Sequence, residues 1–140
     1  MQTQKNHESK KTILFLCPHH AAKSVLAEAY FNRVGLSEFQ AVSAGTEPDE
    51  AVMPSVATML GEDGIDVSNH RPRRVTTEEL HVAARIISMG CTADELGVDT
   101  SRIEVWSDVP PVSQDPYGAR DAILSHIERL IQELLSDASQ

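Results

Sequence analysis

Short apolar runs alternate with helical patterns along this chain, and no other feature restricts its fold as much. Runs typical of strands occupy residues 12–16, 39–44, 84–89 and 103–106. Helical patterns occupy residues 24–33, 54–62, a short stretch after 76, one turn at 92–96, and the region from 119 onward. Strands that alternate with helices predict an α/β fold: a three-layer α/β/α arrangement around a short four-stranded parallel sheet.

Local signals mark the ends of several of these helices. Ser24 is expected at the N-cap of the first helix, and Gly35 is expected to end it. Pro54 suits the first turn of the second helix, and Thr76 and Glu79 have the spacing of a capping box. The helix boundaries are therefore encoded locally.

Length and composition predict one domain. With 140 residues, 41% of them hydrophobic, the chain can bury one sizeable core. Residues 1–11 are polar and lack apolar periodicity, so we expect a disordered leader there and a single domain over residues 12–140.

Charge and hydropathy exclude several classes of partner. The formal net charge of -9 argues against nucleic acid, because phosphate-backbone affinity depends on clustered Lys and Arg. No run approaches the roughly 20 apolar residues that span a bilayer, and the polar N-terminus lacks the apolar core of a signal peptide. We therefore expect no membrane association and a cytoplasmic location.

The first strand ends at Cys17, and a short loop then leads into a helix. Ligands of parallel α/β sheets bind beyond the carboxyl ends of the strands. Loop N–H groups and the positive end of a helix favour an anion and a thiolate at such a place. The pattern predicts a reactive thiol beside a tetrahedral oxyanion, whereas the simpler interpretation is a cysteine that ends a buried strand.

Several ordered motifs make the chain resemble the low-molecular-weight protein tyrosine phosphatase family, and within it the thiol-dependent arsenate reductases. The resemblance runs from about Ile13 to the C-terminal helix and implies the fold of that family. Its matching pieces are Cys17-x5-Lys23-Ser24, Leu26-Ala27-Glu28-Ala29, Ser43-Ala44-Gly45-Thr46-Glu47-Pro48, Gly64-Ile65-Asp66-Val67-Ser68 and Asp115-Pro116.

The resemblance implies that Cys17 is the nucleophile that attacks a bound oxyanion. The oxyanion-binding residues that it implies are His19, His20, Ala21, Ala22, Lys23 and Ser24. The family has an arginine where this chain has Lys23, which keeps the positive charge but lacks the planar, bidentate geometry of a guanidinium.

Two further departures change the loop itself. Pro18 removes one amide donor, and His20 stands where the family has an asparagine. His19 or His20 could add a switchable cation or a hydrogen bond to Cys17, or both could be solvent-exposed imidazoles.

Two more residues receive roles through the resemblance. Asp115 matches the general acid that protonates the leaving group of a phosphomonoester. Cys91 looks like the second cysteine of the arsenate reductases, which resolves the arsenic adduct on the nucleophile by forming a disulfide. The third cysteine of thioredoxin-coupled members is absent from residues 92–98.

Three functions follow, and the sequence leaves all three open. The first is a thiol-dependent arsenate reductase, and the second is a phosphotyrosine phosphatase that forms a phosphocysteine. The third is a catalytically impaired oxyanion-binding or redox-sensing protein. The expected ligands are arsenate, phosphate or phosphotyrosine, and the expected reductant is a low-molecular-weight thiol or a glutaredoxin- or thioredoxin-like protein. We expect no cofactor and no metal, because the acidic residues and adjacent histidines lack ligand spacing.

A basic stretch at Arg71, Arg73 and Arg74 interrupts the acidic chain. It could steer an anion toward the site, but a solvated turn is the interpretation that we favour.

Overall fold

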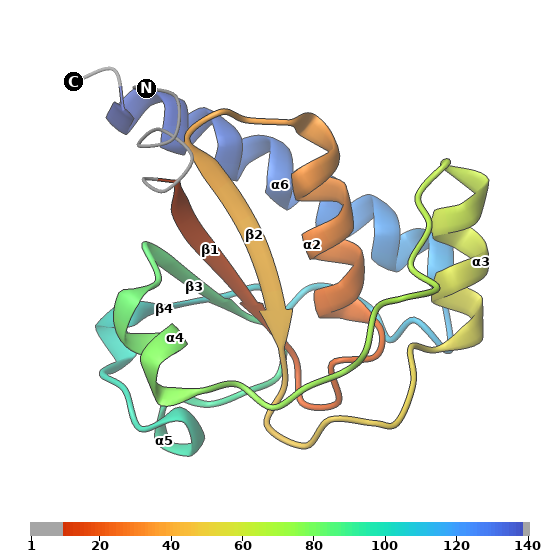
Figure 1. The fold of residues 1–140 in the computed structure, drawn as a ribbon, viewed down its shortest axis with the longest axis horizontal. Helices are drawn as coiled ribbons and strands as arrows, with labels where there is room; N and C mark the ends of the chain where they lie inside the picture. The colour runs from red at the N-terminus through yellow and green to blue at the C-terminus, as the bar shows by residue number, and fades with distance from the viewer. Residues whose placement is uncertain (1–9, 139–140) are drawn as a thin grey trace.

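In the computed structural model, which describes residues 10–138, four strands form one parallel sheet in the order β2-β1-β3-β4 (Figure 1). The strands are β1 (Lys11–Leu16), β2 (Phe39–Ala44), β3 (Arg85–Ser88) and β4 (Ile103–Val105). β1 is hydrogen-bonded on both sides, to β2 along its whole length and to β3 from Ile13 to Leu16. The predicted four-stranded parallel sheet is confirmed.

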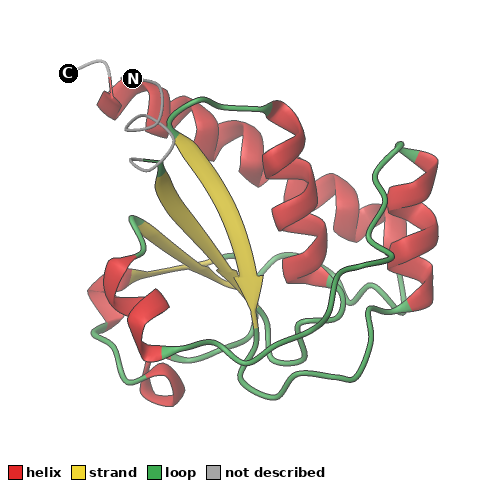
Figure 2. Cartoon of the chain, viewed as in Figure 1, coloured by secondary structure: helices red, strands yellow, loops and turns green. Residues whose placement is uncertain are grey.

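Helices cover both faces of this sheet (Figure 2). They are α2 (Lys23–Val34), α3 (Pro54–Glu62), α4 (Thr77–Val82), α5 (Ala93–Leu96) and α6 (Pro116–Ala138), with a 3-10 turn at Thr100–Arg102. α2 and α6 lie side by side on one face, and α4 and α5 lie on the other. The three-layer α/β/α architecture is therefore also confirmed.

The alternation of side chains along β1 divides the core between these two faces. Ile13 and Phe15 pack in the larger cluster, which α2, α3 and α6 cover. Leu14 and Leu16 pack in the smaller cluster, together with Leu80 of α4. All four of these β1 side chains are fully buried, so the strand that leads to Cys17 lies at the centre of the molecule.

Some element boundaries differ from those expected. Lys11 belongs to β1 rather than to a leader, and the remaining leader prediction for residues 1–9 lies outside the described residues. α6 begins at Pro116 instead of 119, because a proline is well suited to the first helical position. α2 begins at Lys23, so the expectation of Ser24 as its N-cap is wrong: the cap position belongs to Ala22.

The carboxyl ends of the parallel strands meet at one edge of the sheet, at the bottom of Figure 1. Cys17 follows β1 there, Gly45 follows β2, and Cys91 lies three residues beyond the end of β3. No helix within residues 10–138 combines the length and apolar character needed to cross a membrane.

Candidate active site

Cys17 is buried where β1 meets the loop, with 5% of its surface exposed. The backbone N–H of Ser24 donates to its Sγ at 3.4 Å, and the Ser24 hydroxyl lies 3.0 Å from the same sulfur. Hydrogen bonds that donate to sulfur stabilise negative charge on it. Ser24 therefore bonds the Cys17 sulfur rather than capping the helix.

In the loop after Cys17, the backbone carbonyl groups are hydrogen-bonded, but most of the backbone N–H groups are not. Its carbonyls accept bonds from the segment after β2: Glu47 N to Pro18 O at 2.7 Å, Asp49 N to His19 O at 2.9 Å, and Met53 N to Ala21 O at 2.9 Å. Within the described chain, the N–H groups of residues 19–23 have no acceptor. A row of unpaired backbone donors is the usual construction of an anion cradle.

The start of α2 adds to this cradle. Ala22 at the N-cap has no side chain able to accept from the first turn, and the structure shows no side-chain cap bond there. The first N–H groups of α2 and its positive dipole end therefore face the loop. An anion bound beside Cys17 would supply the missing acceptor.

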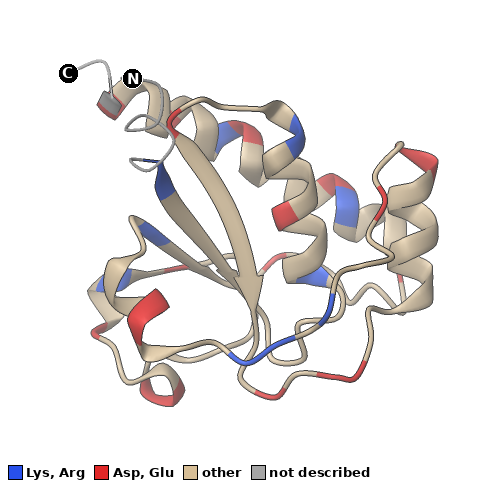
Figure 3. Ribbon diagram, in the orientation of Figure 1, with Lys and Arg blue, Asp and Glu red and all other residues tan. Residues whose placement is uncertain are grey.

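Lys23 is the cationic side chain that lines the pocket beside Cys17. It is the first residue of α2, and no carboxylate of residues 10–138 forms an ion pair with it. This pocket of about 270 Å³ lies at the sheet edge. Figure 3 shows acidic residues on the segment that follows β2, and this segment contributes Asp49 to the same pocket. The pocket is lined by Cys17, Pro18, His19, Ala21, Ala22, Lys23, Asp49, Met53, Met89, Pro111, Val112 and Ser113.

His20 turns away from this pocket into a buried polar network. Its Nδ1 accepts from the Arg73 N–H at 2.8 Å, so the neutral ring carries its proton on Nε2, which lies 2.7 Å from Ser43 Oγ and 3.0 Å from His70 Nε2. Ser43 donates in turn to Glu28 at 2.6 Å. Burial and the neighbouring His70 lower the pKa of His20 to about 4. His20 is thus a neutral support of the loop.

The backbone of His20 explains why the network is needed. Its φ is 49°, in the left-handed region that residues other than glycine rarely adopt. The bonds to both ring nitrogens hold the residue in this conformation. Because its partners lie 23 and more positions away in sequence, no local pattern could have revealed the network.

His19, in contrast, stands exposed at the mouth of the pocket. Its Nδ1 lies 3.1 Å from the Glu47 carbonyl oxygen and 3.3 Å from Asp49 Oδ1. The interpretation of two solvent-exposed imidazoles therefore holds for His19 and fails for His20.

Cys91 is buried in the loop after β3, close to the Cys17 loop. The Thr46 hydroxyl lies 3.8 Å from its sulfur, and a Cβ placed on Gly90 would come within 2.9 Å of Pro18 Cδ. The two cysteine loops therefore touch through Gly90 and Pro18. Burial raises the pKa of the Cys91 thiol, and the Thr46 hydroxyl partly opposes that rise. Both cysteines are free thiols.

Asp115 lies just outside the set of residues that line the pocket. Its carboxylate accepts from the Gly118 N–H at 3.0 Å at the start of α6, while Pro111, Val112 and Ser113 of the same segment form one wall. The nearby aromatic residues contribute no wall: Trp106 is buried against Phe15, and Tyr117 bonds to Glu62.

Arg73, in the basic segment before α4, has a structural role. The Arg73 guanidinium bonds both carboxylate oxygens of Glu79, at 2.8 and 2.5 Å, and holds the pKa of that carboxyl below its usual range. Arg73 is therefore paired and does not face an incoming anion.

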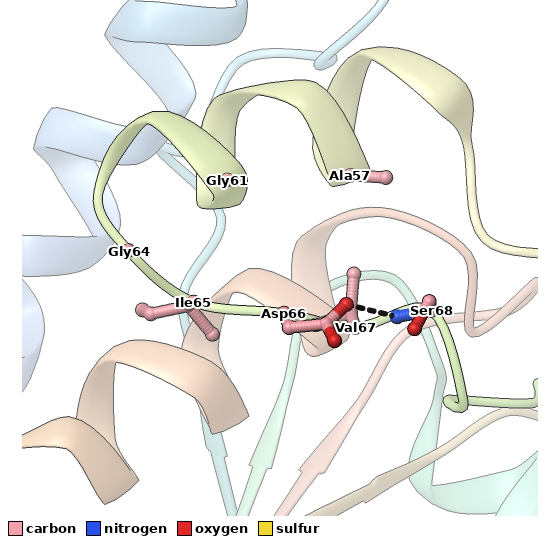
Figure 4. Close-up of a pocket in the computed structure, with 7 residues that line it drawn as sticks. All are labelled: Ala57, Gly61, Gly64, Ile65, Asp66, Val67 and Ser68. Atoms are coloured by element: carbon pink, nitrogen blue, oxygen red, sulfur yellow. Dashed lines mark hydrogen bonds between the residues drawn. The ribbon is translucent and has the colours of Figure 1, made fainter.

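A second hollow of about 260 Å³ lies between α3 and residues 64–68 (Figure 4). Its one acidic side chain, Asp66, accepts from the Ser68 N–H at 2.9 Å, so its polar groups satisfy one another. Elsewhere too, the described part of the chain has no cluster of three His, Cys, Asp or Glu side chains suited to a metal ion.

Sequence reasoning missed six residues of the Cys17 pocket: Asp49, Met53, Met89, Pro111, Val112 and Ser113. Asp49 and Met53 are held there by backbone bonds to the loop, and Met89 by its bond to Leu16 O at 2.7 Å. The position of Met89 directly after a strand was the only available signal, since pocket-lining residues have no characteristic spacing.

Comparison with known proteins agrees with this geometry. Residues 12–138 match the profile of the family described as "Low molecular weight phosphotyrosine protein phosphatase". An arsenate reductase of Brevibacillus brevis is 32% identical over 131 residues, which cover 89% of this chain and 97% of the relative.

Two solved structures share the fold. YfkJ of Bacillus subtilis superposes with a TM-score of 0.81 at 22% identity, covering 92% of this chain and 97% of that one. A thioredoxin-dependent arsenate reductase of Corynebacterium glutamicum superposes with a TM-score of 0.77 at 23% identity, covering 99% of this chain and 67% of the other.

Proposed function

Because this chain belongs to the low molecular weight phosphotyrosine protein phosphatase family, we propose that it is a thiol-dependent arsenate reductase with Cys17 as its nucleophile. The observation that carries the proposal is the meeting of two free, buried cysteines on touching loops, one of them inside an anion cradle. The similarity to the Brevibacillus brevis arsenate reductase supports the same reaction.

The first step is a substitution at arsenic. The N–H groups of residues 19–23 and the Lys23 ammonium hold the arsenate oxygens, and this leaves arsenic in front of Cys17 Sγ. The thiolate forms an S–As bond, the As–O bond to the opposite hydroxyl breaks, and this hydroxyl departs as water after it gains a proton. Arsenic remains pentavalent in this step.

The second step transfers two electrons. Cys91 loses its proton and attacks Cys17 Sγ, so an S–S bond forms and the S–As bond breaks. The bonding electron pair stays on arsenic, which leaves as arsenite, while the two sulfurs are oxidised to a disulfide. Since burial raises the pKa of Cys91, the Thr46 hydroxyl would assist its ionisation.

An external thiol closes the cycle. Two equivalents of a low-molecular-weight thiol, or one glutaredoxin- or thioredoxin-like dithiol, would reduce the Cys17–Cys91 disulfide by exchange. We place this cycle in the cytoplasm, where such reductants keep cysteines reduced.

Phosphotyrosine hydrolysis is the second candidate, favoured by Asp115, which follows the pocket wall formed by residues 111–113. Cys17 would form a phosphocysteine, and Asp115 would protonate the leaving alcohol and then activate water. That role requires its carboxylate to leave the Gly118 N–H. The lack of an aromatic wall favours a small inorganic oxyanion instead.

Paired assays test the proposal. Purified protein is supplied with arsenate plus glutathione, a glutaredoxin or a thioredoxin, and separately with p-nitrophenyl phosphate. We expect arsenite formation that Cys17→Ser and Cys91→Ser each abolish, while Cys17→Ser still binds inorganic phosphate. Aryl phosphate hydrolysis that survives Cys91→Ser, without arsenite formation, would favour the phosphatase instead. Phosphate binding without turnover of either substrate would identify an impaired oxyanion-binding protein.

A further inference from the structure

The leaving oxygen of the substrate must receive a proton, and the pocket holds few groups that could supply it. The titratable side chains that line it are Cys17, His19, Lys23 and Asp49. Cys17 is the nucleophile, and Lys23 must keep its charge to hold the anion. Because Asp115 is bonded to Gly118 and does not line the pocket, the remaining candidates are His19 and Asp49.

The geometry of His19 fixes which of its nitrogens is available. Nδ1 faces two acceptors, the Glu47 carbonyl oxygen at 3.1 Å and Asp49 Oδ1 at 3.3 Å. A nitrogen between two acceptors carries a proton, so Nδ1–H is the donor in both protonation states. Nε2 has no partner among the described residues and is the atom that can exchange a proton with a bound ligand.

Two backbone bonds hold the histidine at this position. Glu47 N–H donates to Pro18 O at 2.7 Å, and Asp49 N–H donates to His19 O at 2.9 Å. The same segment that supplies the partners of the ring is thus fastened to the histidine's own backbone. This arrangement resembles the general case of an imidazole oriented by a carboxylate, in which the carboxylate also stabilises the imidazolium.

We propose that His19, oriented by Asp49, is the proton donor for the leaving oxygen at this site. The proposal rests on the proposed function and deepens it. As Cys17 Sγ bonds to arsenic and the As–OH bond breaks, the Nε2 proton of the His19 imidazolium passes to the departing hydroxyl, and water leaves. The ring becomes neutral, Asp49 keeps its negative charge, and no electron is transferred in this step.

The pH dependence of kcat/KM for arsenate tests the donor. His19→Gln removes the donor and should lower kcat/KM by about 100-fold and flatten its pH profile. Asp49→Asn, which removes the orienting carboxylate, should lower kcat/KM by a smaller factor. His81→Gln, at an exposed histidine on α4, is the matched control and should change neither kcat/KM nor its pH profile. A full loss in Asp115→Asn with an unchanged His19→Gln profile would overturn the proposal.

A binding measurement separates this proposal from the proposed function. Inorganic phosphate is added while the imidazole nitrogens and the amides of residues 19–23 are followed by NMR. We expect both sets of signals to shift when phosphate binds. Shifts of the amides alone would reject the role of His19 but keep the cradle, whereas no shift of either would reject both.

Discussion

The loops after β1 and β3 begin alike and end differently. Each follows a buried parallel strand, carries a cysteine and leads into a helix at the same sheet edge. After β3 the polar groups are closed: Ser88 Oγ bonds the backbone of Cys91, and Thr92 and Glu95 form a capping box on α5. After β1 the N–H groups of residues 19–23 have no acceptor among the described residues, and Ala22 at the N-cap of α2 provides no side-chain cap.

This difference distinguishes the N-terminus of α5, which is capped by side chains of the protein, from the N-terminus of α2, which is free to bind a ligand. A Ser, Thr, Asp or Asn at the N-cap of a helix typically stabilises a protein by about 1 kcal/mol. The chain uses that device at α4 and α5 and omits it at α2 and α3. α3 has Pro54 in its first turn instead, whereas α2 has neither a side-chain cap nor such a proline, and an anion can take the place of the cap there.

The largest expected effect concerns how each loop bends. The β3 loop bends at Gly90, with φ of 122°, whereas the β1 loop bends at His20 and relies on buried bonds to a neutral ring. Since the pKa of His20 is about 4 in the folded protein and the ordinary pKa of histidine is 6.5, the unfolded chain binds more protons between these pH values. His20 should therefore stabilise the fold fully above pH 6.5 and lose about 3 kcal/mol of that effect as pH falls to 4.

Urea unfolding of His20→Asn at several pH values between 4 and 7 tests this effect. The variant should show a flatter dependence of stability on pH than the parent, because its side chain does not titrate. His81→Asn, at an exposed position, should keep the parent slope. Equal slopes in the parent and His20→Asn would show that the ring does not impose the pH dependence.

Adding a side-chain cap to α2 in the loop after β1 should have the next largest effect. In Ala22→Asp, the new carboxylate should cap α2 and occupy the cradle with negative charge. We expect phosphate affinity to fall by about 100-fold, since like charges placed together cost several kcal/mol, and the melting temperature to rise. Calorimetric titration and thermal unfolding measure both. Undiminished phosphate affinity would place the anion elsewhere.

Restoring an arginine to the open loop should have a smaller effect. Lys23→Arg should raise turnover by about tenfold, because a guanidinium orients two oxygens at once. Steady-state kinetics on arsenate and on an aryl phosphate would measure it. If turnover rises on neither substrate, Lys23 does not limit the rate. The other two departures of this loop from the family, Pro18 and His20, would then be responsible for any low activity.

Removing the capping box in the loop after β3 is expected to have the smallest effect. Thr92→Ala removes the capping box of α5 and should cost about 1 kcal/mol of stability, with little change in phosphate binding. Urea unfolding and a binding titration provide the two readouts. A large loss of phosphate affinity would show that the two loops are coupled more tightly than their contact at Pro18 and Gly90 indicates.

Prediction from sequence succeeded where the signals were local. The capping box at Thr76 and Glu79, the helix end at Gly35 and the four strands all depend on neighbouring residues, and the structure has each of them. The N-cap at Ser24 was wrong because a serine hydroxyl also bonds sulfur, and only the fold brings Cys17 within 3.0 Å of it. The buried setting of His20 and the place of Asp49 in the pocket depend on contacts between distant segments.

The central place of β1 has a consequence for the dynamics of this edge. A strand bonded on both sides and buried on both faces opens only when the whole domain unfolds, so the amides of Phe15 and Leu16 should exchange hydrogen as slowly as any in the chain. The unpaired amides only a few residues further on should exchange fastest. A steep gradient of hydrogen-exchange protection would then run through Cys17. Its sulfur would be attached to the most protected part of the chain and would lie beside the least protected amides.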